Sequence, residues 1–505
     1  MPNTDNATPA PGASDGSPDV AVVGTGPNGL AAAATLARAG LRVVLYEAAD
    51  DIGGGLRGKA LFDSDIVHDI CSAVHPLAAA SPFLREFDLA ARGVELLRSD
   101  ISYAHPLPDG PSGLAYRDLE STCASLGADG PRWRALMQPL LDHSDGVVDL
   151  VLASQRSVPQ DLVAPLLLGT RVVRHGTPLA SGAFTTEAAR SLLAGVAGHA
   201  VGRLPSLASA AVALLLGHLA HNAGWPVPRG GSARLATALV DDITAHGGVF
   251  RTGHRVGDLR ELGDAAVVLL DTSPKEFLRI AGARLPGRYA RRLDRFRYGP
   301  AAAKVDFLTS EPIPWADPRV GQASTVHLGG TQAMLFRQET LTDAGVATEE
   351  PFVLVVDPAV ADPERARAGR RPVWAYAHVP NGDRRDPVPL VTRVLEQYAP
   401  GFADTVVAAA GVSGAEYEQY NPNYVGGDIG GGAMTLRQAL ARPTPRIDPY
   451  ATPLSGVYLC SASTPPGPGV HGMSGYLAAR SALRREFGIR EAPALAPDSA
   501  GSASG

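Results

Sequence analysis

The sequence predicts an α/β fold with a parallel sheet, joined to a second, discontinuous α+β unit that has a mixed sheet and a helical lid. Three observations predict it. An apolar strand near the start of the chain runs into a glycine-rich turn and a helix. Strand and helix patterns return over residues 232–270, and strands of alternating polarity occur within 298–440. Successive β and α segments favour a parallel sheet, whereas alternating strands favour a sheet with two different faces.

The first of these segments contains a motif with a specific chemical purpose. After the strand at 19–23, the pattern Gly24-x-Gly26-x-x-Gly29 opens an alanine-rich helix, and a second strand ends before Glu47. The first glycine permits a sharp turn, the second lets a pyrophosphate approach the backbone, and the third lets the helix pack on the strand. The free N–H groups of the helix can bind phosphate, and Glu47 can accept hydrogen bonds from an adenosine ribose. The sequence therefore predicts a dinucleotide site, with an ordinary glycine-rich turn as the alternative.

Composition excludes several other classes of function. The chain has 505 residues, enough for two large domains or about three ordinary ones. Its net charge of −6 gives no reason to expect a nucleic-acid partner, which would call for a basic face. The three cysteines are isolated, so neither a redox disulfide nor a metal site is predicted, and a reducing, cytoplasmic location fits. High Arg, Ala and Gly content suggests a bacterial source, for which specialised metabolism is plausible.

The domain boundaries follow changes in composition. Pro-, Ser- and Ala-rich ends predict disordered tails at 1–18 and 489–505. Between them we expect a dinucleotide-binding domain made from 19–105, 226–290 and 441–488. The substrate-binding domain should comprise 106–225 and 291–440. The longest apolar run, 204–220, is shorter than the ~20 residues of a membrane-spanning helix. It predicts a buried or substrate-lining helix, with peripheral membrane contact as the alternative.

Further segments resemble one known family. They are 53–57, 69–76, 225–232, Lys304 with 312–315, 324–330, 421–428 and 469–475. With the glycine motif, they make residues 19–488 resemble the phytoene-dehydrogenase-like branch of the FAD-dependent amine oxidase and carotenoid desaturase superfamily. The resemblance implies a Rossmann-like FAD-binding domain and flavin chemistry.

The motif and the resemblance together assign a set of cofactor contacts. These are Gly24, Gly26, Pro27, Asn28, Gly29, Glu47, Ala48, Gly54, Gly55, Leu56, Arg57, Ser72, Val74, Val256, Gly469, Val470, Gly472 and Met473. Arg57 can neutralise phosphate or face the flavin, with a surface arginine as the alternative. By resemblance, the helix behind the loop at 469–475 points its N-terminus at the flavin, where it would stabilise negative charge on reduction. The segment that carries a covalent thioether in some relatives has no cysteine here, so FAD should be non-covalent.

Lys304 is the first catalytic candidate. The chain has three lysines among 45 basic residues, and Lys304 lies within an apolar strand, where burying an ammonium group is costly. The strand resembles the one whose lysine holds a water near flavin N5 in amine oxidases. An outward, solvated lysine fits the alternation equally well.

Histidines and a tyrosine complete the catalytic candidates. By resemblance, His75 and His471 lie in cofactor-proximal loops and His327 at a strand end, where each can act as acid, base or flavin-edge donor. Histidines that only bond a backbone carbonyl are the alternative. Tyr424, with Tyr420, resembles the aromatic cage of amine oxidases, although core tyrosines are equally compatible with the pattern.

The resemblance implies an FAD-dependent oxidoreductase, a dehydrogenase, desaturase or oxidase, that moves hydride from a largely apolar small molecule to flavin N5 and forms a double bond. No second Gly-x-Gly-x-x-Gly turn directly joins an apolar strand to a helix, so oxygen, a quinone or another carrier would reoxidise the flavin. A redox-neutral flavin isomerase and a non-catalytic escort protein of the same fold are the alternatives; the intact motif argues against the second. Whether the chain forms a homo-oligomer is open.

Overall fold

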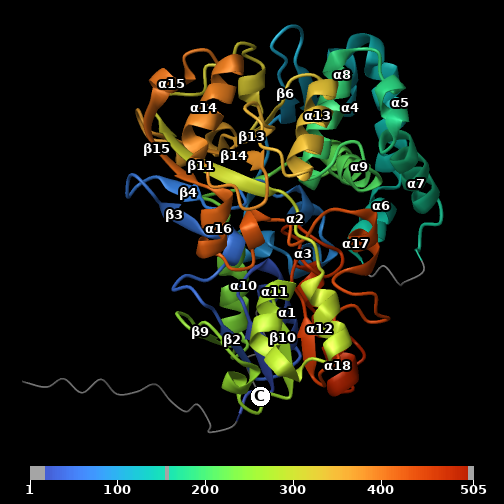
Figure 1. Cartoon of the computed structure of the whole chain (residues 1–505), viewed down its shortest axis with the longest axis vertical. Coiled ribbons are helices and arrows are strands. Elements are labelled where there is room, and N and C mark those ends of the chain that lie inside the picture. Colours follow the sequence, from blue (N-terminus) through green and yellow to red (C-terminus); the bar gives the residue numbers. More distant parts are fainter. Residues whose placement is uncertain (1–16, 154–158, 499–505) are drawn as a thin grey trace, which may run out of the picture.

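The computed structural model describes residues 17–153 and 159–498. Residues 1–16 and 499–505, where most of the two predicted tails fall, lie outside this description. The described chain contains two large sheets, a five-stranded one in the lower half of Figure 1 and a seven-stranded one in the upper half. The predicted α/β class with a second, mixed-sheet unit is confirmed.

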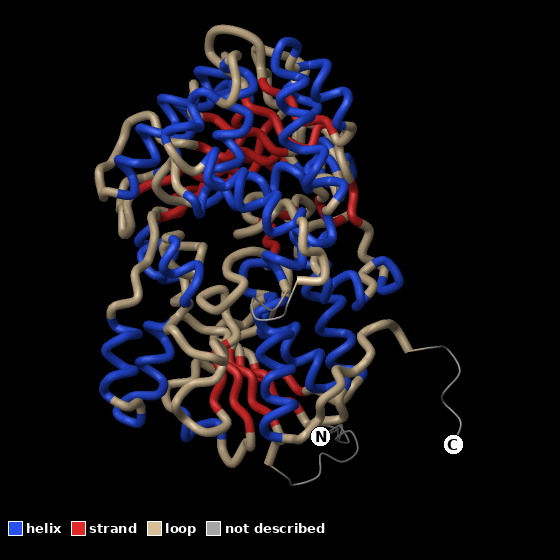
Figure 2. The backbone as a smooth tube through the Cα atoms, turned by 90° about the vertical axis from the view of Figure 1, so that its right-hand side faces the viewer, coloured by secondary structure: helices blue, strands red, loops and turns tan. Residues whose placement is uncertain are grey.

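The five-stranded sheet is parallel throughout, in the order β16-β10-β1-β2-β9. Three separate stretches of the chain supply its strands: β1 (Val20–Val23), β2 (Val43–Tyr46), β9 (Val249–Arg251), β10 (Val267–Leu270) and β16 (Val457–Leu459). Helices cover both faces (Figure 2): α1 (Pro27–Arg38), α10 (Ala233–Ala245) and α18 (Met473–Glu486) pack on one, and α11 (Pro274–Ala281) and α12 (Gly287–Asp294) on the other. Because both faces are covered, β1 and β10 are apolar and buried along their whole length.

The seven-stranded sheet is mostly antiparallel, in the order β15-β11-β14-β13-β12-β6-β7. Its strands are β6 (Ile101–His105), β7 (Gly113–Tyr116), β11 (Ala301–Thr309), β12 (Thr325–Leu328), β13 (Val353–Val356), β14 (Arg371–Val379) and β15 (Val406–Val412). The sequence places 101–105 in the dinucleotide-binding domain, but β6 pairs in this sheet instead. Its Ala104 lies opposite Val326 of β12, and its other edge pairs with β7. Two small antiparallel pairs, β3 (Gly58–Ala60) with β4 (Val67–Asp69) and β5 (Leu96–Leu97) with β8 (Val227–Pro228), complete the strands.

The alternation along these strands gives the sheet two different faces. One face, with Val305, Val355 and Val373, packs under α14 (Pro387–Tyr398). The opposite face, with Leu354 and Trp374, belongs to the same apolar cluster as the helices between β7 and β8. The second face therefore looks into the interior of the molecule.

A group of helices lies beside the β6–β7 edge of this sheet (Figure 1). They are α4 (Leu119–Ser125), α5 (Gly130–Asp142), α6 (Ser144–Leu152), α7 (Ala164–His175), α8 (Glu187–Ala197) and α9 (Leu207–His221). The remaining helices are α2 (Pro76–Ala80), α3 (Pro82–Phe87), α13 (Gln332–Asp343), α15 (Phe402–Thr405), α16 (Gly414–Tyr420) and α17 (Leu436–Ala441). The apolar run at 204–220 forms most of α9, which is largely buried. None of the helices in the described ranges combines the length and the apolar composition that a membrane crossing requires.

The described part of the predicted C-terminal tail, residues 489–498, is packed against the protein. Leu495 is fully buried in the main apolar cluster. Arg38 at the end of α1 donates hydrogen bonds to the carbonyl oxygens of Ala494, at 3.1 Å, and Ala496, at 3.0 Å. These contacts hold Leu495 and its neighbours against the protein, although most side chains of the segment are exposed.

Candidate active site

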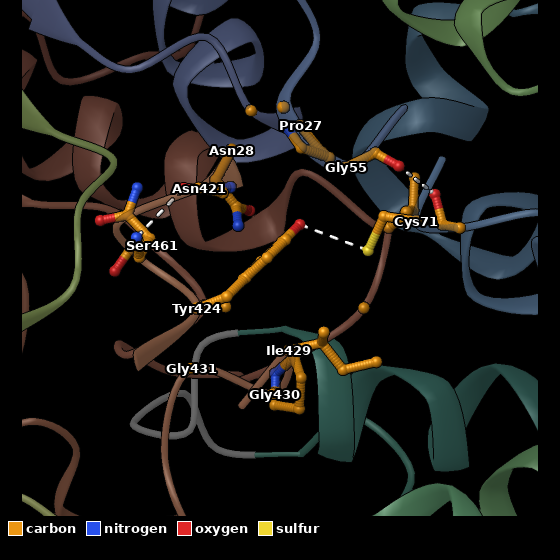
Figure 3. A pocket seen from close by; sticks show the side chains of 18 of the residues that line it. Pro27, Asn28, Gly55, Cys71, Asn421, Tyr424, Ile429, Gly430, Gly431 and Ser461 are labelled. Atoms are coloured by element: carbon orange, nitrogen blue, oxygen red, sulfur yellow. Dashed lines mark hydrogen bonds between the residues drawn. The ribbon is translucent and has the colours of Figure 1, made fainter. Parts of the chain in front are cut away.

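A cavity of about 730 Å³ lies between the two sheets. Its wall includes the turn after β1, with Pro27 and Asn28, and the segment 461–470 from the far end of the sequence. Figure 3 shows Pro27, Asn28 and Ser461 around the same space, with Tyr424 reaching across it. The two ends of the chain meet because α1 packs on α18: a Cβ on Gly475 would lie 1.8 Å from the carbonyl oxygen of Asn28.

Each glycine of the motif lies in close contact with backbone or with the side chain of Asp271. A Cβ on Gly29 would lie 2.1 Å from the carbonyl oxygen of Gly24, so only glycine lets α1 approach β1 this closely. Gly24 has a φ of +96°, which disfavours any side chain. A Cβ on Gly26 would lie 2.6 Å from Oδ2 of Asp271. The open surface left above these glycines forms one end of the cavity.

Asp271 is a cavity residue that the sequence analysis missed. It follows β10, and its Oδ2 accepts a hydrogen bond from the backbone N–H of Gly29 at 2.9 Å. Burial raises the pKa of Asp271 to about 7; the Gly29 hydrogen bond opposes this shift and the nearby charge of Glu47 adds to it. The signal that could have found it is its position, because ligands of open parallel sheets bind at the carboxyl ends of the strands.

We expect Asp271→Asn to stabilise the protein at high pH, by up to about 4 kcal/mol at pH 8. Asp271 has an ordinary pKa near 3.8 but about 7 when folded, so between these values the folded state holds a proton that the unfolded state has released. The free energy of unfolding therefore falls as the pH rises from about 4 to 7. Asparagine removes this loss and keeps an acceptor for Gly29. Urea unfolding of both proteins at pH 4 and pH 8 measures the difference; equal differences at the two pH values would contradict it.

Glu47 and Arg57 form a buried ion pair on the cavity wall. Arg57 Nη2 lies 3.0 Å from Glu47 Oε1, and Oε2 accepts the backbone N–H of Thr25 at 3.0 Å. Arg57 also donates to the carbonyl oxygen of Asp51 at 2.9 Å. The alternative of a surface arginine is wrong, since the Arg57 side chain is only 6% exposed. The ribose contact of Glu47 stays a prediction.

Most of the predicted cofactor contacts lie on the cavity wall. Those that do are Gly24, Gly26, Pro27, Asn28, Glu47, Ala48, Gly54, Gly55, Arg57, Ser72, Val74, Val256, Gly469 and Val470. Four do not: Gly29, Leu56, Gly472 and Met473. Gly29 and Gly472 instead permit close packing, the latter because a Cβ there would lie 2.9 Å from Cβ of Ala31. Leu56 is a fully buried core residue.

The two predicted histidines have different surroundings. His75 lies on the cavity wall, with Nε2 2.8 Å from Oγ of Ser232. Because the Ser232 hydroxyl donates to the carbonyl oxygen of Ser72, it accepts from His75, which leaves a bare lone pair on Nδ1. Burial lowers the pKa of His75 to about 4, with Asp69 opposing, so the ring is neutral at pH 7.

His471 does not reach the cavity wall. Its Nδ1 accepts the N–H of Met473 at 3.0 Å, and its Nε2 lies 3.1 Å from the carbonyl oxygen of Gly467. Both ring nitrogens therefore hold the loop at the start of α18, and neither is left for a substrate. This is the backbone-bonded alternative, and the acid–base role predicted for His471 has no support in this geometry.

Lys304 is buried, so the solvated alternative is wrong. Its Nζ forms an ion pair with Asp306, two residues along β11, and lies 5.8 Å from the centre of the Trp374 ring. Burial lowers the pKa of Lys304, and the charge of Asp306 opposes that shift. Trp374 lines the cavity but Lys304 does not. The structure therefore places the lysine beside the cavity-lining residues of β14 but not on the cavity wall.

Tyr424 lies on the cavity wall, as does a thiol that the sequence analysis did not select. The Tyr424 hydroxyl donates to Sγ of Cys71 at 3.4 Å (Figure 3). Burial raises the pKa of Cys71, so the thiol is protonated at neutral pH. The hydroxyl of Tyr420 lies 3.5 Å from Nη1 of Arg57 and also faces the cavity.

The inner face of the seven-stranded sheet forms the opposite end of the cavity. Pairing across β12, β13, β14 and β11 aligns two rows of side chains on this face. One row is Thr325, Val356, Trp374 and Asp306. The other is His327, Leu354, Tyr376 and Lys304. The apolar members of both rows line the cavity, as do residues of the helical lid: Val151, Leu152, Val212, Leu215 and Leu216. This end is therefore a mainly apolar chamber.

Comparisons with known proteins agree with this architecture. Residues 22–87 match the NAD(P)-binding Rossmann-like domain. The chain is 26% identical to pyridine nucleotide-disulfide oxidoreductase domain-containing protein 2 of Rattus norvegicus, over 92% of this chain and 93% of that protein. It is also 26% identical to the phytoene dehydrogenase of Streptomyces griseus, over 77% of each chain. In sequence and in fold the chain therefore resembles the amine oxidase and phytoene dehydrogenase superfamily. Its fold is also that of cyclohexylamine oxidase from Brevibacterium oxydans, with a TM-score of 0.57 at 15% identity over 94% of this chain and 100% of that structure.

These relatives and the structural neighbour are named as an oxidoreductase, a dehydrogenase and an oxidase. The cavity has the layout that such chemistry needs. A glycine cradle at the carboxyl ends of parallel strands faces an apolar chamber, with His75 and Tyr424 on its wall.

Proposed function

We propose that the protein is an FAD-dependent oxidoreductase that removes hydride from a largely apolar small molecule and forms a double bond. The observation that carries the proposal is the single cavity, which joins a dinucleotide cradle to an apolar chamber. The named activity of the Streptomyces relative, phytoene dehydrogenation, supports an apolar substrate.

The residues present fit FAD. The carboxamide oxygen of Asn28 is buried at the cavity with no hydrogen-bond partner among the described residues, so it is left for a ligand. Gly24 and Gly26 leave the backbone of the turn bare on the cavity wall. The backbone of Gly24 and Gly26 and the N–H of Asn28 would hold the pyrophosphate, the Asn28 carboxamide oxygen would accept from a ligand N–H or O–H, and Gly469 and Val470 would border the flavin. Non-covalent binding fits a protonated Cys71, since a thiol is a weak nucleophile.

Bound FAD supplies a hydride acceptor. The protein's own residues orient the substrate and hold protons. Trp374, Tyr376 and the lid residues bury the substrate and exclude water. His75, neutral and with a bare Nδ1, is the acceptor for a proton lost beside the hydride. Tyr424 would border the substrate opposite Gly55. Oxygen or a quinone would take up the electrons, and oligomeric state and peripheral membrane contact stay open.

Anaerobic substrate addition tests this function. We expect the purified protein to be yellow with released FAD after denaturation, and apolar candidates such as unsaturated terpenes to bleach the oxidised flavin absorbance. Product mass two units below the substrate would identify dehydrogenation. A colourless protein that takes up no added FAD would contradict the proposal, and product of unchanged mass would identify an isomerase instead.

A further inference from the structure

A histidine pair borders the apolar chamber. His199 follows α8 and lies on the cavity wall, with Nε2 2.8 Å from Nε2 of His327 on β12. The ring of Trp225 packs against His199 edge to face, with ring centres 5.1 Å apart. His327 is fully buried behind it. The chamber therefore carries a fixed imidazole that the proposed reaction does not use.

The hydrogen bond between the two rings fixes which one donates. If His327 accepted at Nε2, its proton would lie on Nδ1, which is buried and has no partner in the described part of the chain. A buried N–H without an acceptor is rarer than a bare lone pair. His327 therefore donates from Nε2, and His199 accepts there and carries its proton on Nδ1. Since no bond to Nδ1 of His199 occurs among the described residues, this N–H is left for a ligand.

A second polar group lies beside the pair. Thr325 is on the same face of β12 as His327, two residues away, and it lines the cavity. Its hydroxyl is buried and has no hydrogen-bond partner within the described ranges. Leu354 and Val356, which pair with His327 and Thr325, are apolar. A buried polar atom without a partner costs free energy unless a ligand satisfies it.

The group that these residues can bind is a neutral oxygen. Burial lowers the pKa of His199 to about 3, with the charge of His378 adding to the effect, so its ring is uncharged at pH 7. The cavity-lining arginines, Arg57, Arg255 and Arg279, belong to the dinucleotide-binding domain. A carboxylate in the chamber would thus be buried beside an uncharged ring, which is costly. A carbonyl or hydroxyl oxygen carries no such cost.

We propose that His199 and Thr325 bind a carbonyl or hydroxyl oxygen of an otherwise apolar substrate, with His327 as the positioning residue that fixes the His199 ring. This specificity rests on the proposed function, because it assumes that the chamber holds the substrate. It predicts that the substrate is an oxygenated molecule and not a pure hydrocarbon.

Binding of matched ligands tests the proposal in the FAD-loaded protein. Carvone and limonene share one carbon skeleton and differ by a carbonyl, and 2-dodecanone and 1-dodecene form a linear pair. Dissociation constants come from quenching of tryptophan fluorescence, to which Trp225 beside His199 contributes. We expect each ketone to bind about 3- to 10-fold more tightly than its hydrocarbon, the range for one neutral hydrogen bond.

Variants assign the effect to the named residues. His199→Phe keeps an aromatic ring of similar shape and should remove the preference while limonene binding is retained, which shows that the chamber is intact. His199→Asn keeps an N–H near the Nδ1 position and should restore most of the preference. Thr325→Val should reduce the preference for the ketone. His327→Phe should also weaken this preference, although residue 327 does not contact the ligand.

The outcomes separate this proposal from the proposed function. Loss of the yellow cofactor from the wild-type protein would overturn the function itself. In a protein that retains FAD, equal affinities for ketone and hydrocarbon, no binding of either ketone, or a preference that survives in His199→Phe would overturn oxygen recognition alone.

Discussion

Replacing Gly29 with alanine is expected to abolish FAD binding and to lower the free energy of unfolding by about 3 kcal/mol or more. The new Cβ would lie 2.1 Å from the carbonyl oxygen of Gly24 and 3.1 Å from Oδ2 of Asp271. The first contact is with backbone, so no side-chain rotation relieves it. Helix α1 must move away from β1, and its N-terminus then no longer faces the phosphates. The ratio of flavin to protein absorbance and thermal unfolding measure the two effects.

Two further glycine-to-alanine changes calibrate this result. Gly475→Ala should be equally damaging, since its Cβ would lie 1.8 Å from the carbonyl oxygen of Asn28 and would separate α18 from α1. Gly169 lies in the middle of α7 with no atom within 4 Å of its added Cβ. Gly169→Ala should stabilise the protein by up to about 1 kcal/mol, because alanine is the better helix former. A Gly29→Ala protein with normal flavin content would refute the packing argument.

The sequence predicts the geometry of the glycine-lined end of the cavity well because this end is built from neighbouring elements. The turn from Gly24 to Gly29 joins adjacent elements, so spacing alone defines its geometry. The packing of α18 on α1 is not local, and it follows only from the resemblance of the loop at 469–475. Gly472 and Met473 belong to that contact and not to the cavity wall, a distinction that needs three-dimensional packing.

The substrate end could not be predicted in the same way. His199 and His327 meet because β12 lies next to the chain that follows α8, and no sequence spacing records this contact. The orientation of Lys304 was also open, since both faces of β11 are buried and alternation then carries no information. Asp271 could be recognised only from the structure, in which its carboxylate accepts a hydrogen bond from the N–H of Gly29 in the first turn of α1.

The last prediction concerns the buried pair of Lys304 and Asp306. Asp306→Asn keeps the shape of the side chain but leaves the ammonium group of Lys304 buried without its counter-charge. Removing one partner of such a pair costs about 3–5 kcal/mol. We expect a loss of that order in urea unfolding at pH 7. Lys304→Met should be similarly damaging, because it leaves the buried carboxylate of Asp306 without the ammonium group.

The double variant Lys304→Met with Asp306→Leu separates stability from catalysis. Replacing both charges with apolar groups of similar size is often neutral, so it should recover most of the stability lost by Asp306→Asn. Because Lys304 does not line the cavity, the rates of flavin reduction and reoxidation in this variant should stay within about threefold of wild type. A change of that size is smaller than the largest effect of losing one neutral hydrogen bond. Stopped-flow absorbance of the flavin measures both rates. A much slower reoxidation in a stable double variant would contradict this expectation. It would support the role that the amine oxidase resemblance implies, in which Lys304 acts near the flavin through a bound water.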